Sequence, residues 1–421
     1  MRQEGSPAVL ARQLARAGHL APAWRGPFAR VDRKLFLPDR VWIRDVGGEY
    51  GEYGEEGTNG EGGVDGEEGA NGEGGVDDEE GMDGVHGYRA VDRATDPAGW
   101  HALAYEDRAL VTQVEASPAD GNTARVPSSS ASMPRVVARM LDALAVTDGT
   151  TVLEIGTGTG YNAALLSERL GDRNVVTVEV DARIADTARA NLKDAGHTPT
   201  VVTGDGSLGC PTYAPYDRII VTCALHTVPY PLVEQTAPGG ALVLPWGTGL
   251  YNGVLLRLTA SGDGTASGPV IGDSAFMWNR YETPHRDVMA TVRARPRSTG
   301  ATATTLDPRH VFGHEDAAFT AGVLVPDCRY SVGHGPGGEF TLWLADHATG
   351  SWASVDYVPD GRPAHGLQQH GPRALWHEVE AAYAWWQEAG SPERTRYGLT
   401  VTPAGQHLWL DAPDARVRRR T

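Results

Sequence analysis

The sequence predicts an α/β protein with a mostly parallel sheet and helices on both of its faces, followed by a smaller α+β module. Three observations lead to this prediction. Patterns typical of strands and helices alternate between residues 135 and 245, a glycine-rich turn follows one buried apolar run, and the composition changes after residue 260.

The first expected element is a short amphipathic helix. Ser6 suits its N-cap, Pro7 its first turn, and Gly18 lies just past its end. Residues 19–46 continue from this helix, so we predict that residues 1–46 form a helical N-terminal arm.

An acidic, glycine-rich insertion follows over residues 47–88. Residues 59–70 recur almost unchanged as residues 71–82, and residues 47–87 hold 14 Asp and Glu without any Lys or Arg. Such a segment repels itself and has almost nothing to bury, which predicts disorder. A calcium site is the alternative, because acidic repeats can ligate hard cations, but the ordered EF-hand spacing is absent.

The regular alternation defines a domain over residues 89–260. A helix that begins at residue 135 leads to residues 151–155, an apolar run that reads as a strand buried on both sides. The later patterns predict helices over 161–170, 182–195 and 229–236, strands over 175–180, 200–203, 218–222 and 241–245, and a hairpin piece over 253–259.

Residues 261–421 form the predicted α+β module, which is rich in Gly, Pro, His and Trp. One helix ends near Trp386 before Gly390, and two short strands, 399–401 and 408–410, flank a turn. The tryptophans Trp385, Trp386 and Trp409 suit either a peptide-binding groove or, more often at such spacing, a buried core.

Composition excludes several kinds of partner. Outside the acidic insertion the chain carries a formal charge of only −3 and has no basic face for nucleic acid; the arginines between residues 416 and 420 are expected in a solvated tail. Arginines interrupt the apolar N-terminus and no later apolar run is long enough for a bilayer. We therefore expect a soluble, cytoplasmic monomer with no nucleic-acid or membrane partner.

The three cysteines also fit a reducing compartment. Cys210, Cys223 and Cys328 are odd in number, far apart and without metal-ligand spacing. We predict neither a disulfide framework nor a metal site.

A nucleoside pocket is the strongest chemical feature of the sequence. Residues 154–161 read Glu-Ile-Gly-Thr-Gly-Thr-Gly-Tyr between a buried strand and a helix, where glycines allow close approach of a ligand. A bare G-x-G-x-G is weak on its own, and its third glycine comes one residue early for a dinucleotide fingerprint.

Two acids make the nucleoside reading more specific. Glu179 ends the next strand, where a carboxylate can accept from both ribose hydroxyls, and Gly204-Asp205-Gly206 follows the third strand, where an acid can accept from an adenine amino group. Each acid alone could be a helix cap. The three loops together point to the crevice at the carboxyl ends of the strands.

These motifs resemble the protein-L-isoaspartate O-methyltransferase family. The likeness covers residues 89–250, including the YEDR segment that begins at Tyr105 and resembles the family's Y-x-D strand, VLEIGTGTGYNAALL, GDGSLGCPTYAPYDRIIVTCALHTVP and PGGALVLPWG. Residues 9–40 also resemble the family's N-terminal helix and its V-x-R-x-x-F-x-P segment.

The resemblance implies a Rossmann-like class I methyltransferase fold with a mostly parallel seven-stranded sheet. It also implies S-adenosylmethionine as cofactor and S-adenosylhomocysteine as product. The residues that it assigns to the cofactor are Glu154, Gly156, Thr157, Gly158, Gly160, Tyr161, Glu179, Val180, Gly204, Asp205, Gly206 and Thr222.

The acceptor side departs from the family. Where the family has T-I-S-Q-P, this chain has Ser130-Ala131-Ser132-Met133-Pro134, so Ser132 and Ser130 match the family's serine and threonine while Met133 replaces glutamine. By resemblance Ser132 and Ser130 hold the acceptor carboxylate. For residues 128–130 a serine-rich helix cap is an equal alternative.

Further residues are expected to line the acceptor site: Ser129, Met133, Cys223 and His226. His226 could act as a base, but a carboxylate is already ionised and offers no proton to remove, so packing is the favoured role.

The C-terminal half is similar to extended actinobacterial members that tailor ribosomally made peptides such as lanthipeptides, graspetides and lasso peptides. This implies esterification of a genuine aspartate in a cyclised precursor peptide, with closure to an aspartimide that can hydrolyse to isoaspartate. General isoaspartate repair is the first alternative. A noncatalytic peptide-binding scaffold with a vestigial nucleoside pocket is the second.

Overall fold

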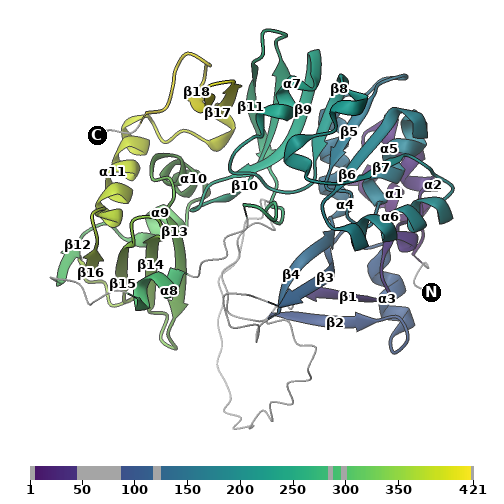
Figure 1. Ribbon diagram of the computed structural model, residues 1–421. Helices are drawn as coiled ribbons and strands as arrows, with labels where there is room; N and C mark the ends of the chain where they lie inside the picture. The colour runs from purple at the N-terminus through teal and green to yellow at the C-terminus, as the bar shows by residue number, and fades with distance from the viewer. Residues whose placement is uncertain (1–4, 45–86, 117–124, 283–287, 295–300, 419–421) are drawn as a thin grey trace.

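The computed structural model describes residues 5–44, 87–116, 125–282, 288–294 and 301–418. They form three sheets of four, nine and five strands. Almost all of the acidic insertion lies outside the described residues, so its predicted disorder stays a prediction. In Figure 1 the N-terminal helices lie at one end of the molecule and the five-stranded sheet lies at the other.

The N-terminal arm begins as predicted. The hydroxyl of Ser6 accepts a hydrogen bond from the backbone of Val9 at 3.3 Å and caps α1. The arm continues into an antiparallel sheet with strand order β2-β1-β3-β4. The elements of this part are α1 (Pro7–Arg16), α2 (Arg25–Arg30), β1 (Arg40–Arg44), β2 (Tyr88–Asp92), α3 (Pro97–Ala104), β3 (Leu110–Ala116) and β4 (Arg125–Ala131).

One strand prediction in this part is wrong. Tyr105 ends α3 and the following residues turn, so β3 begins only at Leu110. The polar groups of the turn have other partners: Tyr105 donates to Asp32 at 2.6 Å, and Asp107 accepts from the backbone of Arg135 at 2.8 Å. Asp107 thereby satisfies one of the free backbone N–H groups in the first turn of α4.

The central sheet has nine strands in the order β18-β17-β11-β10-β9-β8-β5-β6-β7. Its elements are α4 (Pro134–Leu144), β5 (Val152–Ile155), α5 (Tyr161–Leu170), β6 (Val175–Glu179), α6 (Ala182–Asp194), β7 (Thr200–Thr203), β8 (Tyr216–Val221), α7 (Tyr230–Glu234), β9 (Thr236–Gly247), β10 (Asn252–Ala260), β11 (Ala266–Asp273), β17 (Tyr397–Thr402) and β18 (Gly405–Leu410). Every helix and strand predicted between residues 135 and 260 is present, with small shifts at the ends.

The prediction of a mostly parallel, seven-stranded sheet needs correction. Strands β9, β8, β5, β6 and β7 pair in parallel, whereas the other half of the sheet is antiparallel. Strands β10 and β11 follow β9 as antiparallel neighbours, in agreement with the hairpin piece predicted over 253–259. The hairpin of β17 and β18 then adds two strands to β11 across more than 120 residues of chain. The sheet thus crosses the domain boundary predicted at residue 260.

The parallel half of the central sheet is buried on both faces. The side chains of Val152 and Leu153 are completely buried in β5, and Ile219 and Val221 are completely buried in the adjacent β8. Helices on both faces cover these strands, so their apolar runs need no polar alternation. The carboxyl ends of β5, β6 and β8 therefore hold their loops in fixed places.

The C-terminal part contains a five-stranded antiparallel sheet that the sequence did not predict, with order β12-β16-β15-β14-β13. Its elements are α8 (Val288–Arg293), β12 (Ala301–Thr304), α9 (Pro308–Phe312), α10 (Glu315–Leu324), β13 (Arg329–His334), β14 (Phe340–Asp346), β15 (Ser351–Tyr357), β16 (His365–His370) and α11 (Leu375–Glu388). Trp386 and Trp409 are both 6% exposed, so they belong to the core rather than to a groove. None of the described helices is long and apolar enough to cross a membrane.

Candidate active site

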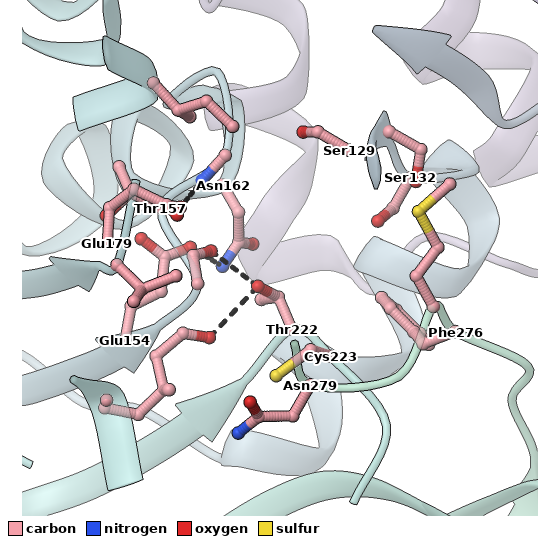
Figure 2. Close-up of a pocket in the computed structure, with 18 of the residues that line it drawn as sticks. Ser129, Ser132, Glu154, Thr157, Asn162, Glu179, Thr222, Cys223, Phe276 and Asn279 are labelled. Carbon is pink, nitrogen blue, oxygen red and sulfur yellow. Dashed lines mark hydrogen bonds between the residues drawn. The ribbon is translucent and has the colours of Figure 1, made fainter. Parts of the chain in front are cut away.

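A cavity lies where the parallel strands of the central sheet end. Loops after β5, β6, β7 and β8 form one side, and β4 together with residues 276–281 forms the other. The predicted residues that line it are Ser129, Ser130, Ser132, Glu154, Gly156, Thr157, Gly158, Tyr161, Glu179, Val180, Asp205, Gly206, Thr222 and Cys223. Figure 2 shows Glu154 and Glu179 across the cavity from Ser129 and Ser132.

The glycine loop requires its glycines for two reasons. Gly156 has φ of +91°, and a Cβ on it would lie 2.6 Å from the hydroxyl of Thr222. That hydroxyl in turn donates to the carbonyls of Ile155 and Gly156 and joins the loop to the end of β8. Gly160, which does not line the cavity, is the N-cap of α5 with φ of +100°.

Glu179 is fixed by the loop that it faces. Its carboxylate accepts from the backbone of Gly158 at 2.9 Å and from the backbone of Asp181 at 3.1 Å, and the residue is 7% exposed. A carboxylate has about four lone-pair sites, so two remain for ribose hydroxyls. The geometry suits the predicted role.

Glu154 lies below the loop and is completely buried. Asn162 donates to one of its oxygens at 2.7 Å and Thr177 to the other at 2.5 Å. Burial raises the pKa of Glu154 to about 7, although these hydrogen bonds oppose the rise. Its oxygens hold the loop and the strand together, so its position indicates support of the pocket more than contact with a ligand.

Asp205 lies at the other end of the nucleoside side. One of its oxygens accepts from the backbone of Ser207 at 2.9 Å and starts a short 3₁₀ turn. A Cβ on Gly206 would lie 2.4 Å from Ile155, whereas one on Gly204 would meet nothing within 4 Å. Gly204 lies outside the cavity lining, but the open space beside it fits the approach of a flat ring.

The serine segment is the end of β4, so the helix-cap alternative for residues 128–130 is wrong. Ser128 donates to Gln113 at 2.9 Å, and Ser129 accepts from Thr112 at 3.2 Å. Among the described residues, no hydrogen bond engages the hydroxyl of Ser130 or Ser132. These two hydroxyls are the ones available to an acceptor.

Two residues predicted to contact the acceptor lie elsewhere. Met133 is buried at the start of α4, and His226 lies behind Trp278, with ring centroids 3.7 Å apart and planes inclined by 20°. Neither lines the cavity. Burial lowers the pKa of His226, so the packing role weighed above is the one that fits.

Residues 276–281 form a wall of the cavity that the sequence did not predict. The backbone of Asn279 donates to Ala224 at 2.9 Å, and the backbone of Ala224 donates to Met277 at 2.8 Å. The carboxylate of Glu282 accepts from the backbones of His226 and Thr227 at 2.7 and 3.2 Å. Figure 2 shows Asn279 close to Cys223 and Phe276 on the same side as Ser132. Residues 224 and 278 are far apart in sequence and share no helical or strand period, so the sequence pattern could not predict that they pair.

Comparisons with known proteins agree with this geometry. The sequence model described as Protein-L-isoaspartate(D-aspartate) O-methyltransferase matches residues 85–277. A protein-L-isoaspartate O-methyltransferase of Methanosarcina mazei is 41% identical over 175 residues, which cover 41% of this chain and 68% of the relative. The chain belongs to this family.

Further similarities extend the finding. A protein-L-isoaspartate O-methyltransferase of Methanococcoides burtonii is 46% identical over 144 residues, which cover 33% of this chain and 71% of the relative. A solved structure of a protein-L-isoaspartate O-methyltransferase has a TM-score of 0.50 at 19% identity, and the alignment covers 96% of this chain and all of that one. The fold is therefore that of a class I methyltransferase.

Membership of the protein-L-isoaspartate O-methyltransferase family makes the chain a carboxyl O-methyltransferase that uses S-adenosylmethionine. The cavity fits that cofactor: buried Glu179 has lone pairs for ribose hydroxyls, and the backbone at Gly158 and Gly204 is open where a Cβ would meet nothing. When bound, the cofactor supplies an electrophilic methyl group on a sulfonium.

Proposed function

We propose that this methyltransferase esterifies the side chain of a genuine aspartate in a cyclised, ribosomally synthesised precursor peptide. The observation that carries the proposal is the wall of residues 276–281. The family match ends at residue 277, yet Trp278, Asn279, Arg280 and Tyr281 line the cavity. An acceptor therefore meets side chains from beyond the matched region.

The C-terminal half supports that wall. Gln406 of β18 donates to the carbonyl of His226 at 2.9 Å and accepts from the backbone of Val228 at 2.9 Å. Trp278 of the wall stacks on His226. The hairpin of β17 and β18 therefore holds, through Gln406, the loop after β8 against which the wall packs. This arrangement favours a role of the C-terminal half in shaping the acceptor side.

The chemistry needs alignment and no general base. An aspartate is ionised at neutral pH, so its oxygen forms the new bond to the methyl carbon while the carbon–sulfur bond breaks and its electron pair stays on sulfur. Burial raises the pKa of Cys223 to about 12, which keeps its thiol neutral beside the acceptor. Ser132 and Ser130 are assigned to hold the acceptor oxygen in line with the methyl group.

The ester prepares a second step within the peptide. The carbon of an ionised carboxylate resists nucleophiles, whereas the neutral ester has an electrophilic carbonyl and can expel methoxide. The next backbone nitrogen therefore attacks the ester carbonyl and closes a five-membered ring. The amide proton leaves with methoxide as methanol. The product is an aspartimide, which water can open to isoaspartate.

Two acceptors tested in parallel decide between this proposal and general isoaspartate repair. The enzyme is incubated with S-adenosylmethionine and either a linear isoaspartyl hexapeptide or a cyclised precursor peptide, and the mass of each peptide is followed. We expect a gain of one methyl group, followed by loss of methanol, in the cyclised peptide. Rapid turnover of the linear isoaspartyl peptide alone would reject the proposal.

A further inference from the structure

Arg33 is a buried cation that forms no salt bridge with any of the described residues. The residue is 1% exposed and begins a short 3₁₀ turn, Arg33–Phe36. Its guanidinium donates only to backbone carbonyls: Nη1 to Ala104 at 3.5 Å and Glu106 at 3.1 Å, and Nη2 to Arg108 at 2.9 Å, Ala131 at 3.2 Å and Ser132 at 3.1 Å. Within the described part of the chain, no carboxylate forms a salt bridge with it, and Asp107 acts on its charge only at longer range.

The charge of this group persists in the interior. Burial lowers the pKa of Arg33 to about 10, which still leaves the guanidinium protonated at neutral pH. Buried charges are usually paired, because desolvation is costly. The carbonyl dipoles that solvate Arg33 stabilise its charge without cancelling it.

The guanidinium of Arg33 lies directly behind the acceptor side of the cavity. Ala131 and Ser132, whose carbonyls bind Arg33, both line the cavity. Tyr161 also lines it, and its buried hydroxyl has no partner among the described residues. The opposite side of the cavity holds the carboxylates of Glu179 and Asp205. Arg280 also lines the cavity, but its guanidinium pairs with Glu115 at 3.3 Å and with Asp181 at 3.4 Å. Anionic groups thus lie on the cofactor side, and the buried cation of Arg33 lies behind the acceptor side.

We propose that Arg33 makes the cavity select an ionised carboxylate over a neutral amide, by placing a positive charge that forms no salt bridge behind Ser132 and by fixing the backbone of that residue. A preorganised charge in a dry site acts more strongly than the same charge in water. Arg33 itself touches no substrate and is a positioning residue. The proposal rests on the proposed function only in requiring a carboxylate acceptor, which a linear isoaspartyl peptide provides equally.

A binding experiment on the unmodified enzyme tests the charge preference. The enzyme is saturated with S-adenosylhomocysteine, which lacks the sulfonium charge, and titrated with the two acceptor peptides above and with analogues in which an amide replaces the acceptor carboxylate. We expect each carboxylate peptide that binds to do so roughly tenfold more tightly than its amide analogue. Equal affinities would overturn the proposal, because any preference must then come from the cofactor.

Substitutions then assign the preference to Arg33. Arg33→Lys keeps the charge, and Arg33→Met removes it. We expect Arg33→Met to abolish the preference for carboxylate while the Kd of S-adenosylhomocysteine stays within about threefold, and Arg33→Lys to retain most of it. Equal losses in both variants would show a purely structural role.

A matched control separates this effect from loss of a buried arginine in general. Arg373 is also largely buried, but it pairs with Asp346 at 3.0 Å and with Glu378, far from the cavity in sequence and in the five-stranded sheet region. Arg373→Met should lower the thermal midpoint without changing the carboxylate preference. A changed preference in that variant would contradict the assignment to Arg33.

Discussion

The backbone N–H of Gly158 donates to the carboxylate of Glu179 across 2.9 Å, so the loop after β5 and the acid that ends β6 form one unit. The glycine loop and Glu179 lie 21 residues apart in sequence. Their contact means that the same carboxylate shapes the loop and faces the ribose position. The affinity for the cofactor should therefore depend steeply on the negative charge of Glu179.

Glu179 is the first residue to test. Glu179→Ala removes the acceptor of two ribose hydrogen bonds, and hydrogen bonds to charged groups contribute about 1.5–3 kcal/mol each. We expect the Kd of S-adenosylhomocysteine, measured by calorimetry, to rise roughly 100-fold, and that of Glu179→Gln to rise less. Asp186→Asn, on the exposed face of α6, is the control and should bind normally. Normal binding by Glu179→Ala would contradict the ribose assignment.

Gly156 should resist substitution more than Gly196, a glycine with a similar positive φ and open space beside it. Gly156→Ala forces a left-handed conformation on alanine, costing about 1–2 kcal/mol, and also drives its Cβ against Thr222. Gly196→Ala carries the same conformational cost at φ of +85° but meets nothing within 4 Å. Thermal unfolding should show the larger loss for Gly156→Ala. If both variants melt at the same temperature, the contact between the new Cβ and Thr222 does not affect the free energy of unfolding.

The stability of the pocket should depend on pH through Glu154. Burial raises the pKa of Glu154 from its usual 4.5 to about 7, so the folded state holds a proton that the unfolded state has lost between these values. Its stabilising contribution is complete below about pH 4.5 and is lost as the pH rises through about 7. We expect Glu154→Gln to flatten the fall in thermal midpoint between pH 5 and pH 8. An unchanged slope would show that Glu154 is already ionised in the folded protein.

Trp278 should affect the acceptor more than the cofactor. Trp278→Ala removes the stacking on His226, which contributes about 0.5–1.5 kcal/mol beyond buried area, and loosens the wall that carries Asn279. The KM for the peptide should rise several-fold, about in proportion to that energy, while the Kd of S-adenosylhomocysteine changes little. Tyr213→Phe, at a side chain 51% exposed, is the control. A larger change in the Kd of S-adenosylhomocysteine than in the KM for the peptide would contradict the assignment of Trp278 to the acceptor side of the cavity.

Local features explain what the sequence could predict. Ser6 caps a helix within its first turn, and Gly156 and Glu179 each follow or end a buried strand whose apolar run is visible in the sequence. The alternating buried strands likewise specify the parallel half of the sheet, because apolar runs of that length bury both faces.

Long-range contacts explain what the sequence could not predict. The last two strands of the central sheet depend on β17 pairing with β11, and the wall of residues 276–281 depends on bridges from Ala224 to Met277 and Asn279. Arg33 lies in an arm where an arginine is ordinarily exposed, and only the folded structure brings Ser132 to it. Contacts between residues so far apart in sequence produce no helical or strand periodicity from which they could be predicted.

The most direct test of carboxylate methylation in this cavity uses S-adenosylmethionine with an isotopically labelled methyl group. The enzyme and Glu179→Ala are each incubated with the cyclised precursor peptide, and the peptide is then treated with mild base. We expect only the unmodified enzyme to transfer the label to the peptide, and the label to leave the peptide as methanol, either on ring closure or on treatment with base, as a methyl ester requires. Label that survives base, or equal labelling by Glu179→Ala, would contradict it.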